Sequence, residues 1–145
     1  MRLSVFLFLS RSKILVSRVV RILTRGDEMS LYDREMGGDW SVLSGGDWST
    51  LVGGFKSTLT GGAHSTLMGG AHSVVTGGFA STLIGSQGST LSGGDRSALT
   101  WKYFDGERVR MYTIYVGQDG ILADTAYYGR WNYVELEFQI ERVPV

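Results

Sequence analysis

The side chains that could do chemistry in this chain are two histidines and a set of evenly spaced serines. His64 and His72 could begin a zinc site, but no third ligand keeps their spacing, so we expect solvated histidines and no metal. A serine occurs in every eight residues from Ser41 to Ser97, with no neighbouring base to take its proton. The sequence therefore predicts no catalytic residues and a protein that is not an enzyme.

Glycine pairs followed by aspartate, as in Gly45-Gly46-Asp47, are similar to two ligand-binding motifs. Calcium-binding repeats have a nine-residue period with Asp at the sixth position, whereas here the period is eight and the sixth residue is Thr, Val or Ala. Phosphate-binding loops precede a helix, whereas these glycines precede strand-like sequence. We therefore expect no cofactor.

All these residues belong to one eight-residue repeat, which occupies residues 37–100 and occurs eight times without insertion. The first position is always Gly, the fifth is always Ser, and the seventh is Leu except at Val75. Paired glycines allow the positive φ and the close backbone approach of a tight corner. The second half of the repeat alternates and is rich in β-branched residues, which predicts a short strand with Ser and Leu pointing inward.

A single repeat has one face to bury, so the smallest closed coil contains two repeats facing each other. We therefore expect an all-β fold, a single-stranded β-solenoid of about four 16-residue coils with parallel sheets. Positions six and eight would then form two flat, uncharged outer faces, one bearing Val42/Ser44, Thr58/Thr60, Val74/Thr76 and Thr90/Ser92, the other Thr50/Val52, Thr66/Met68, Thr82/Ile84 and Ala98/Thr100. A coil of three repeats would scramble these faces, and the sequence alone leaves that alternative open.

The repeats resemble halves of the 16-residue repeats of bacterial ice nucleation proteins, which have Ala-Gly-x-x-Ser-x-x-Thr phrasing. The resemblance is greatest where Gly85–Leu91, Trp101–Arg108 and Gly120–Asp124 follow the order of the family's last repeats and C-terminal cap, and it covers roughly residues 37–128. The family's recurrent Tyr at the third position is absent, and the Thr-x-Thr pair is intact only at Thr58/Thr60. The resemblance implies a protein that binds ice or ordered water and lies at the cell surface or outer membrane.

By this resemblance, the outward threonines are the candidates for ice binding: Thr58, Thr60, Thr76 and Thr90 on one face, and Thr50, Thr66, Thr82 and Thr100 on the other. The family acts through large assemblies, so a homo-oligomer is expected, with assembly candidates Trp40, Trp48, Arg96 and Lys102. We expect the two tryptophans to cover the open end of the first coil; the alternative is a sticky aromatic surface. The expected partners are ice or water surfaces and further copies of the chain.

A second hypothesis is a structural, self-association or cell-surface interaction module without ice activity. Threonine at outward strand positions also reflects simple β-propensity, and Val42, Val52, Met68, Val74 and Ile84 interrupt both faces. The net charge is zero, which gives no support for nucleic-acid binding.

The two ends of the chain differ from the repeat. Residues 1–28 form a basic and apolar leader, followed by residues 29–36 as a lead-in. A membrane span needs ~20 apolar residues, and basic residues interrupt the apolar run of this leader too early. Two interpretations remain for this leader: a basic amphipathic anchor around Ile14, Leu15, Val19, Ile22 and Leu23, or a natural chain that starts at Met29. Membrane contact is expected only in the first case.

Residues 101–145 are aromatic and predict a small antiparallel cap on the last coil. Asp105-Gly106 indicates a hairpin turn, and residues 117–120 indicate a second turn. Apolar and polar residues alternate from Val134 to Glu141, which predicts an amphipathic strand with an acidic edge.

Overall fold

A computed structural model of the chain describes residues 6–9, 15–19 and 34–144, and this part contains strands and turns but no helix. The strands in chain order are β1 (Phe6–Leu9), β2 (Leu15–Val19), β3 (Arg34–Gly37), β4 (Val42–Ser44), β5 (Thr50–Val52), β6 (Thr58–Thr60), β7 (Thr66–Met68), β8 (Val74–Thr76), β9 (Thr82–Ser86), β10 (Ser89–Ser92), β11 (Ala98–Phe104), β12 (Val109–Tyr115), β13 (Tyr127–Asn132) and β14 (Glu137–Arg142).

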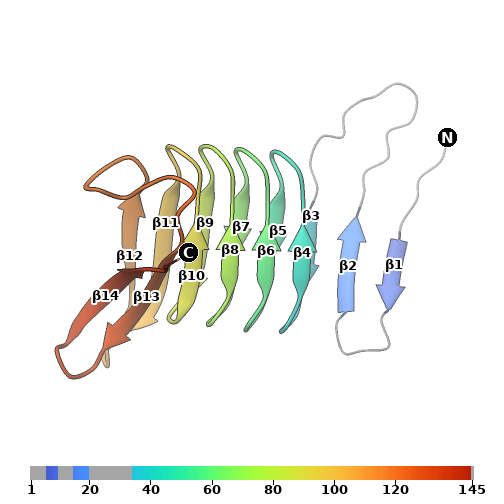
Figure 1. Cartoon of the computed structure of the whole chain (residues 1–145). Helices are drawn as coiled ribbons and strands as arrows, with labels where there is room; N and C mark the ends of the chain where they lie inside the picture. The colour runs from blue at the N-terminus through green and yellow to red at the C-terminus, as the bar shows by residue number, and fades with distance from the viewer. Residues whose placement is uncertain (1–5, 10–14, 20–33, 145) are drawn as a thin grey trace.

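Successive repeats alternate between two parallel sheets, which confirms a coil of two repeats (Figure 1). Sheet A has the order β1-β2-β3-β5-β7-β9-β11-β12, and sheet B has the order β14-β13-β10-β8-β6-β4. In the parallel strands, each residue pairs with the one sixteen positions further on, as in Thr58 with Val74 and Leu59 with Val75. The protein is thus a β-solenoid of about four coils, and the three-repeat alternative is wrong.

The inward and outward positions are those expected from the alternation. The seventh residues, from Leu43 to Leu99, form a continuous core, and none of them is more than 1% exposed. The fifth-position serines, from Ser41 to Ser97, are equally buried beside them. Positions six and eight point outward along β4 to β9.

The buried serines join each coil to the one before it through hydrogen bonds. The Ser73 hydroxyl donates to the Gly54 carbonyl at 3.2 Å and accepts from the Ser57 N–H at 3.3 Å. The Ser73 N–H in turn donates to the Ser89 hydroxyl at 3.2 Å. The same pattern links Ser49, Ser65, Ser81 and Ser97 along the other sheet. From Ser65 onward, the buried serine is tolerated because both the donor and the acceptor capacity of its hydroxyl are used.

The paired glycines are required because a side chain there would collide with neighbouring atoms, not because they adopt a special backbone angle. A Cβ added at Gly69 would lie 2.7 Å from the Cβ of Ser73, and one at Gly70 would lie 2.7 Å from the carbonyl carbon of Gly54 in the preceding coil. Our expectation of positive φ at these glycines is wrong. The left-handed conformation occurs at the fourth position of the repeat, for example at Trp48 (φ 64°) and His64 (φ 56°).

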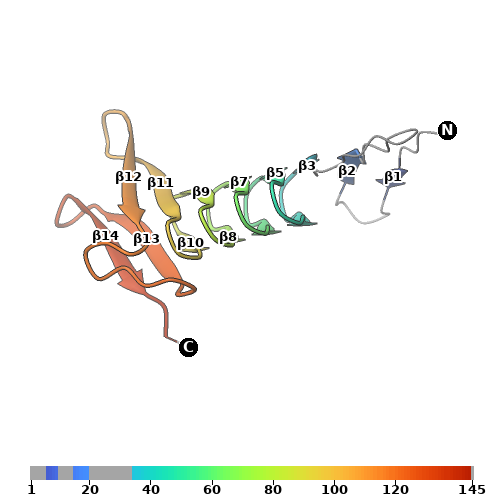
Figure 2. The same ribbon diagram turned by 90° about the horizontal axis from the view of Figure 1, so that it is seen from above.

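The C-terminal cap continues both sheets with antiparallel strands. In sheet A β12 pairs with β11, and in sheet B β13 pairs with β10 and with β14. The Trp101 indole is fully buried at the end of the solenoid core and donates from Nε1 to the Ser89 carbonyl at 2.9 Å. Phe138 packs beside it, with stacked contacts to Tyr103 and Tyr112. The two sheets diverge in the cap, as Figure 2 shows from above. Contacts among Trp101, Phe138, Tyr103 and Tyr112 pack aromatic rings between them.

The turns of the cap agree in part with the expectation. At the first hairpin, hydrogen bonds from the Arg110 guanidinium and from the N–H groups of Arg108 and Glu107 hold the pKa of Asp105 well below its usual range, so this carboxylate stays charged. The predicted strand from Val134 is wrong at its start, because β14 begins at Glu137. The side chain of Asn132 accepts from the N–H groups of Val134 and Glu135 and so forms a turn there. Val134 and Leu136 are consequently exposed.

The N-terminal side of sheet A extends beyond the repeat. β3 pairs in parallel with β5, and β2 and β1 follow it as antiparallel neighbours. Met29 and the expected anchor residues Ile14, Ile22 and Leu23 lie outside the described residues, whereas Leu15 and Val19 bound β2. Among the described residues, there is no helix with the length and apolarity needed to span a membrane.

Replacing Ser73 with alanine tests the serine links. The change leaves the N–H of Ser57 and the carbonyl of Gly54 without their buried partner, so we expect a loss of about 1 to 3 kcal/mol in the free energy of unfolding. Urea unfolding followed by circular dichroism measures this loss. Ser44→Ala, on the exposed side of β4, is the matched control and should change stability by less than about 0.5 kcal/mol. Equal effects of the two changes would contradict the role given to the buried serines.

Replacing Trp101 with alanine tests the cap. Removing this buried ring opens a cavity beside Leu91 and Leu99, and the expected loss is about 3 to 5 kcal/mol. Trp40→Ala, which removes a ring that is 57% exposed, should cost far less. Thermal unfolding of both variants provides the comparison; similar melting temperatures would show that the cap does not close the core.

Candidate functional site

The outer face of sheet B carries two straight columns of side chains across β4, β6, β8 and β10. One column contains Val42, Thr58, Val74 and Thr90, and the other contains Ser44, Thr60, Thr76 and Ser92. Thr58, Thr60 and Thr76 are exposed, and Thr90 is half-buried. Four of the eight proposed ice-binding threonines are thus brought together on this surface, which we name the hydroxyl face.

The outer face of sheet A has a different character. Thr50, Thr66 and Thr82 form one column across β5, β7 and β9, with Thr50 half-buried and the other two exposed. Beside them, Val52, Met68 and Ile84 form a half-buried aliphatic column. Met36 on β3 continues that column and is 63% exposed. We name this surface the mixed face.

Thr100 lies next to Ile84 on the outward side of sheet A, as expected, but it is covered there and does not belong to an open surface. Its side chain is only 6% exposed, and its hydroxyl shares a hydrogen bond of 2.8 Å with the hydroxyl of Thr113. Thr113 lies directly opposite on β12, which continues sheet A beyond the last coil. The cap therefore removes Thr100 from the candidate set.

The geometry of the hydroxyl face is regular and stiff. Neighbouring strands of a sheet are ~4.8 Å apart, and outward residues two apart on one strand are separated by ~6.6 to 7 Å. Threonine adds a hydroxyl and a methyl group on a side chain whose χ1 is restricted, so little side-chain entropy remains to be lost on ordering. Such a surface can hold water molecules at fixed spacings, and it has no convergent acid, base or nucleophile among its columns.

The corners of the coils carry two further columns of aromatic and cationic side chains. On one corner, Trp48 stacks on His64 with ring centroids 4.4 Å apart, and His64 meets the edge of Phe79 at 5.7 Å. On the other, the Lys56 Nζ lies 4.7 Å from the centroid of Trp40. Trp40, Trp48, Lys56 and His64 have the left-handed backbone conformation, which normally favours glycine.

The four assembly candidates are exposed but are not brought together. Trp40 and Trp48 are 57% and 55% exposed on different corners, and their ring contacts are to the next coil, so the expected covering of the open end is wrong. Arg96 lies over Phe79 at the far end of the Trp48 corner. Lys102 is exposed on β11 in the cap. His64 and His72 lie on opposite corners, and the described residues contain no group of three potential metal ligands.

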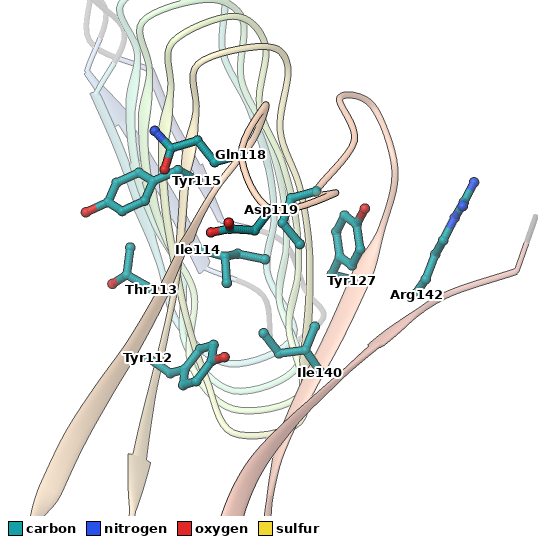
Figure 3. Close-up of a pocket in the computed structure, with 10 residues that line it drawn as sticks. Tyr112, Thr113, Ile114, Tyr115, Gln118, Asp119, Tyr127, Ile140 and Arg142 are labelled. Atoms are coloured by element: carbon teal, nitrogen blue, oxygen red, sulfur yellow. The ribbon is translucent and has the colours of Figure 1, made fainter.

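A cavity of about 550 Å³ opens at the C-terminal end of the molecule, between β12 and β14 (Figure 3). Sequence reasoning did not find it, because its walls come from segments that only the divergence of the two sheets brings together. The lining residues are Tyr112, Thr113, Ile114, Tyr115, Gln118, Asp119, Ile121, Tyr127, Ile140 and Arg142. In the close-up, Ile114 and Ile140 point into the space between the strands.

No protein-family model matches this chain, and it matches no curated protein and no solved structure.

A double-mutant cycle on Trp48 and His64 tests the corner column. The stacked pair should show a coupling free energy of about 0.5 to 1.5 kcal/mol between Trp48→Ala and His64→Ala. Trp40 and His64 lie on different corners and serve as the control pair, with an expected coupling near zero. Urea unfolding of the single and double variants gives both values, and equal coupling in the two cycles would contradict the column.

Proposed function

We propose that this protein is a non-enzymatic β-solenoid, like those of bacterial ice nucleation proteins, that binds ice or ordered water through its flat faces and acts through self-assembly. The observation that carries the proposal is the hydroxyl face, where exposed Thr58, Thr60 and Thr76 stand in register with Ser44, Ser92 and Thr90. The resemblance of the repeat to that family supports the same function.

The hydroxyl face is the better candidate of the two. It has one column with a hydroxyl at every coil, from Ser44 to Ser92, and a second column in which Thr alternates with Val. Methyl groups lie between the hydroxyls, so water ordered on this face would meet a repeating pattern of donors and apolar contacts. On the mixed face, only the column of Thr50, Thr66 and Thr82 offers hydroxyls.

The length of the array limits what one molecule does. Four coils span only ~15 to 19 Å at the strand spacing, which is a small template for an ice nucleus. We therefore propose weak ice binding by the monomer and nucleation only by an assembly of many copies. A location at the cell surface or outer membrane remains part of the proposal by resemblance.

A specific observation favours the second candidate, an interaction module without ice activity. The aliphatic column of Met36, Val52, Met68 and Ile84 on the mixed face is the kind of apolar surface that another chain could cover. Its strands of three to five residues offer much less than the ~800 Å² per partner of a standard interface, so this contact alone would give a weak dimer. Light scattering and ice-shaping assays separate the two candidates, since a stable dimer that leaves ice crystals unshaped supports the interaction module.

An ice-affinity partition tests the proposed function. Thr58→Lys with Thr76→Lys places two charged side chains on the hydroxyl face, and we expect the fraction of protein incorporated into growing ice to fall to the level of a non-binding protein. Tyr133→Lys with Val134→Lys adds the same charge at an exposed turn of the cap and should leave incorporation unchanged. Thr66→Lys with Thr82→Lys reports whether the mixed face contributes. Equal exclusion of the original chain and the Thr58/Thr76 variant from ice would remove this function.

A further inference from the structure

Each sheet ends in strands that have a partner on one side only. Among the described residues, β1 pairs only with β2 at the N-terminal end of sheet A, and β12 pairs only with β11 at its C-terminal end. An edge strand presents unpaired N–H and C=O groups, which another strand can use. The two ends of sheet A are therefore potential partners for each other in different molecules.

The C-terminal edge borders an apolar cavity. β12 and β14 flank the cavity of about 550 Å³, and Ile114, Ile140 and Tyr127 contribute its apolar walls (Figure 3). Ile114 and Ile140 are only partly buried, although both pack against the core. A strand added beside β12 would cover them.

The N-terminal edge has the composition that such a site would accept. β1 consists of four apolar residues, Phe6 to Leu9, and so forms an apolar edge strand. Pairing of β1 from one copy with β12 of the next would continue sheet A from molecule to molecule. Because β1 and β12 are the outer strands of sheet A, neither end would have to rearrange to form this pair.

Charge favours the same pairing. Residues 1–26 contain Arg2, Arg11, Lys13, Arg18, Arg21 and Arg25 and no acidic residue. Residues 101–145 contain seven acidic residues against five basic ones. Asp119 and Arg142 line the cavity, and exposed Glu141 lies beside it. Two copies of the N-terminal segment would repel each other, whereas an N-terminal segment and a cap attract each other.

From these observations we propose that copies of this chain join head to tail, with β1 of one copy docking along β12 at the cap cavity of the next. The two surfaces are different, so the contact does not close on itself and the product is an open chain of molecules. Each joint involves a short strand and is expected to be weak and salt-sensitive. The proposal rests on the proposed self-assembly, and its test measures association alone. A chain that stays monomeric would remove both the joint and self-assembly, whereas ice binding by the monomer is tested separately by the ice-affinity partition.

Two variants of the full chain, each with one disabled end, test the direction of the contact. Leu7→Asp with Phe8→Asp disables β1, and Asp119→Lys with Glu141→Lys reverses the charge at the cavity while leaving its apolar walls intact. Glu107→Lys with Glu135→Lys places the same charge change at the two hairpin turns and is the control. Circular dichroism establishes that every variant is folded before association is measured by sedimentation equilibrium.

We expect the average mass of the original chain and of the control to rise with concentration beyond that of a dimer, and to fall again at high salt. Each disabled variant alone should remain monomeric. An equimolar mixture of the two should form a dimer and nothing larger, because one intact β1 and one intact cavity remain in the mixture. A monomeric original chain at ~1 mM, continued growth of either variant, or a mixture that stays monomeric would each overturn the proposal. Those outcomes would mean that the cavity binds something other than β1 of another copy, such as an extended peptide of a different protein.

Discussion

Hydrogen bonds from buried serines to the preceding coil are the interactions on which the rest of the structure depends. From Ser65 onward, each serine hydroxyl donates to a glycine carbonyl of the preceding coil and accepts from a serine N–H of that coil, as Ser73 does with Gly54 and Ser57. These bonds exist only when consecutive coils are offset by sixteen residues. The glycine pairs also fit only this close stacking of coils, because a side chain at Gly70 would collide with the coil before it. Register, corner and core are therefore fixed together.

The same register creates the surfaces. Because residues sixteen apart are neighbours, a change at one repeat position becomes a column on one side of the solenoid. Threonine and serine at the eighth position of alternate repeats give the hydroxyl face, whereas valine, methionine and isoleucine give the mixed face. Trp48 and His64, which are sixteen residues apart, stack at a corner for the same reason. The two faces consequently differ in chemistry, one rich in hydroxyl groups and the other in aliphatic side chains.

Much of this architecture can be predicted from the sequence because the same pattern of glycine, serine and leucine occurs in eight consecutive repeats. Alternation alone places Leu59 inside and Thr58 and Thr60 outside, and the need to bury one face predicts two repeats in a coil. The failures lie where a contact distant in sequence decides. Thr100 is buried by Thr113, and the turn at Val134 is set by the side chain of Asn132. The positive φ at the fourth position has no sequence signal, since Trp, Lys and His rarely adopt it. The cap cavity depends on the divergence of the two sheets.

Native-state hydrogen exchange at the inward serines tests the central claim most directly. The amide protons of Ser57, Ser65 and Ser73 are donated to buried serine hydroxyls of the next coil, so they should exchange only through unfolding of the whole solenoid, as slowly as those of the core leucines. The exposed end strand β4 provides faster-exchanging amides for comparison. Rapid exchange at these three serines, with protection retained elsewhere in the sheets, would contradict a solenoid held in register from its interior.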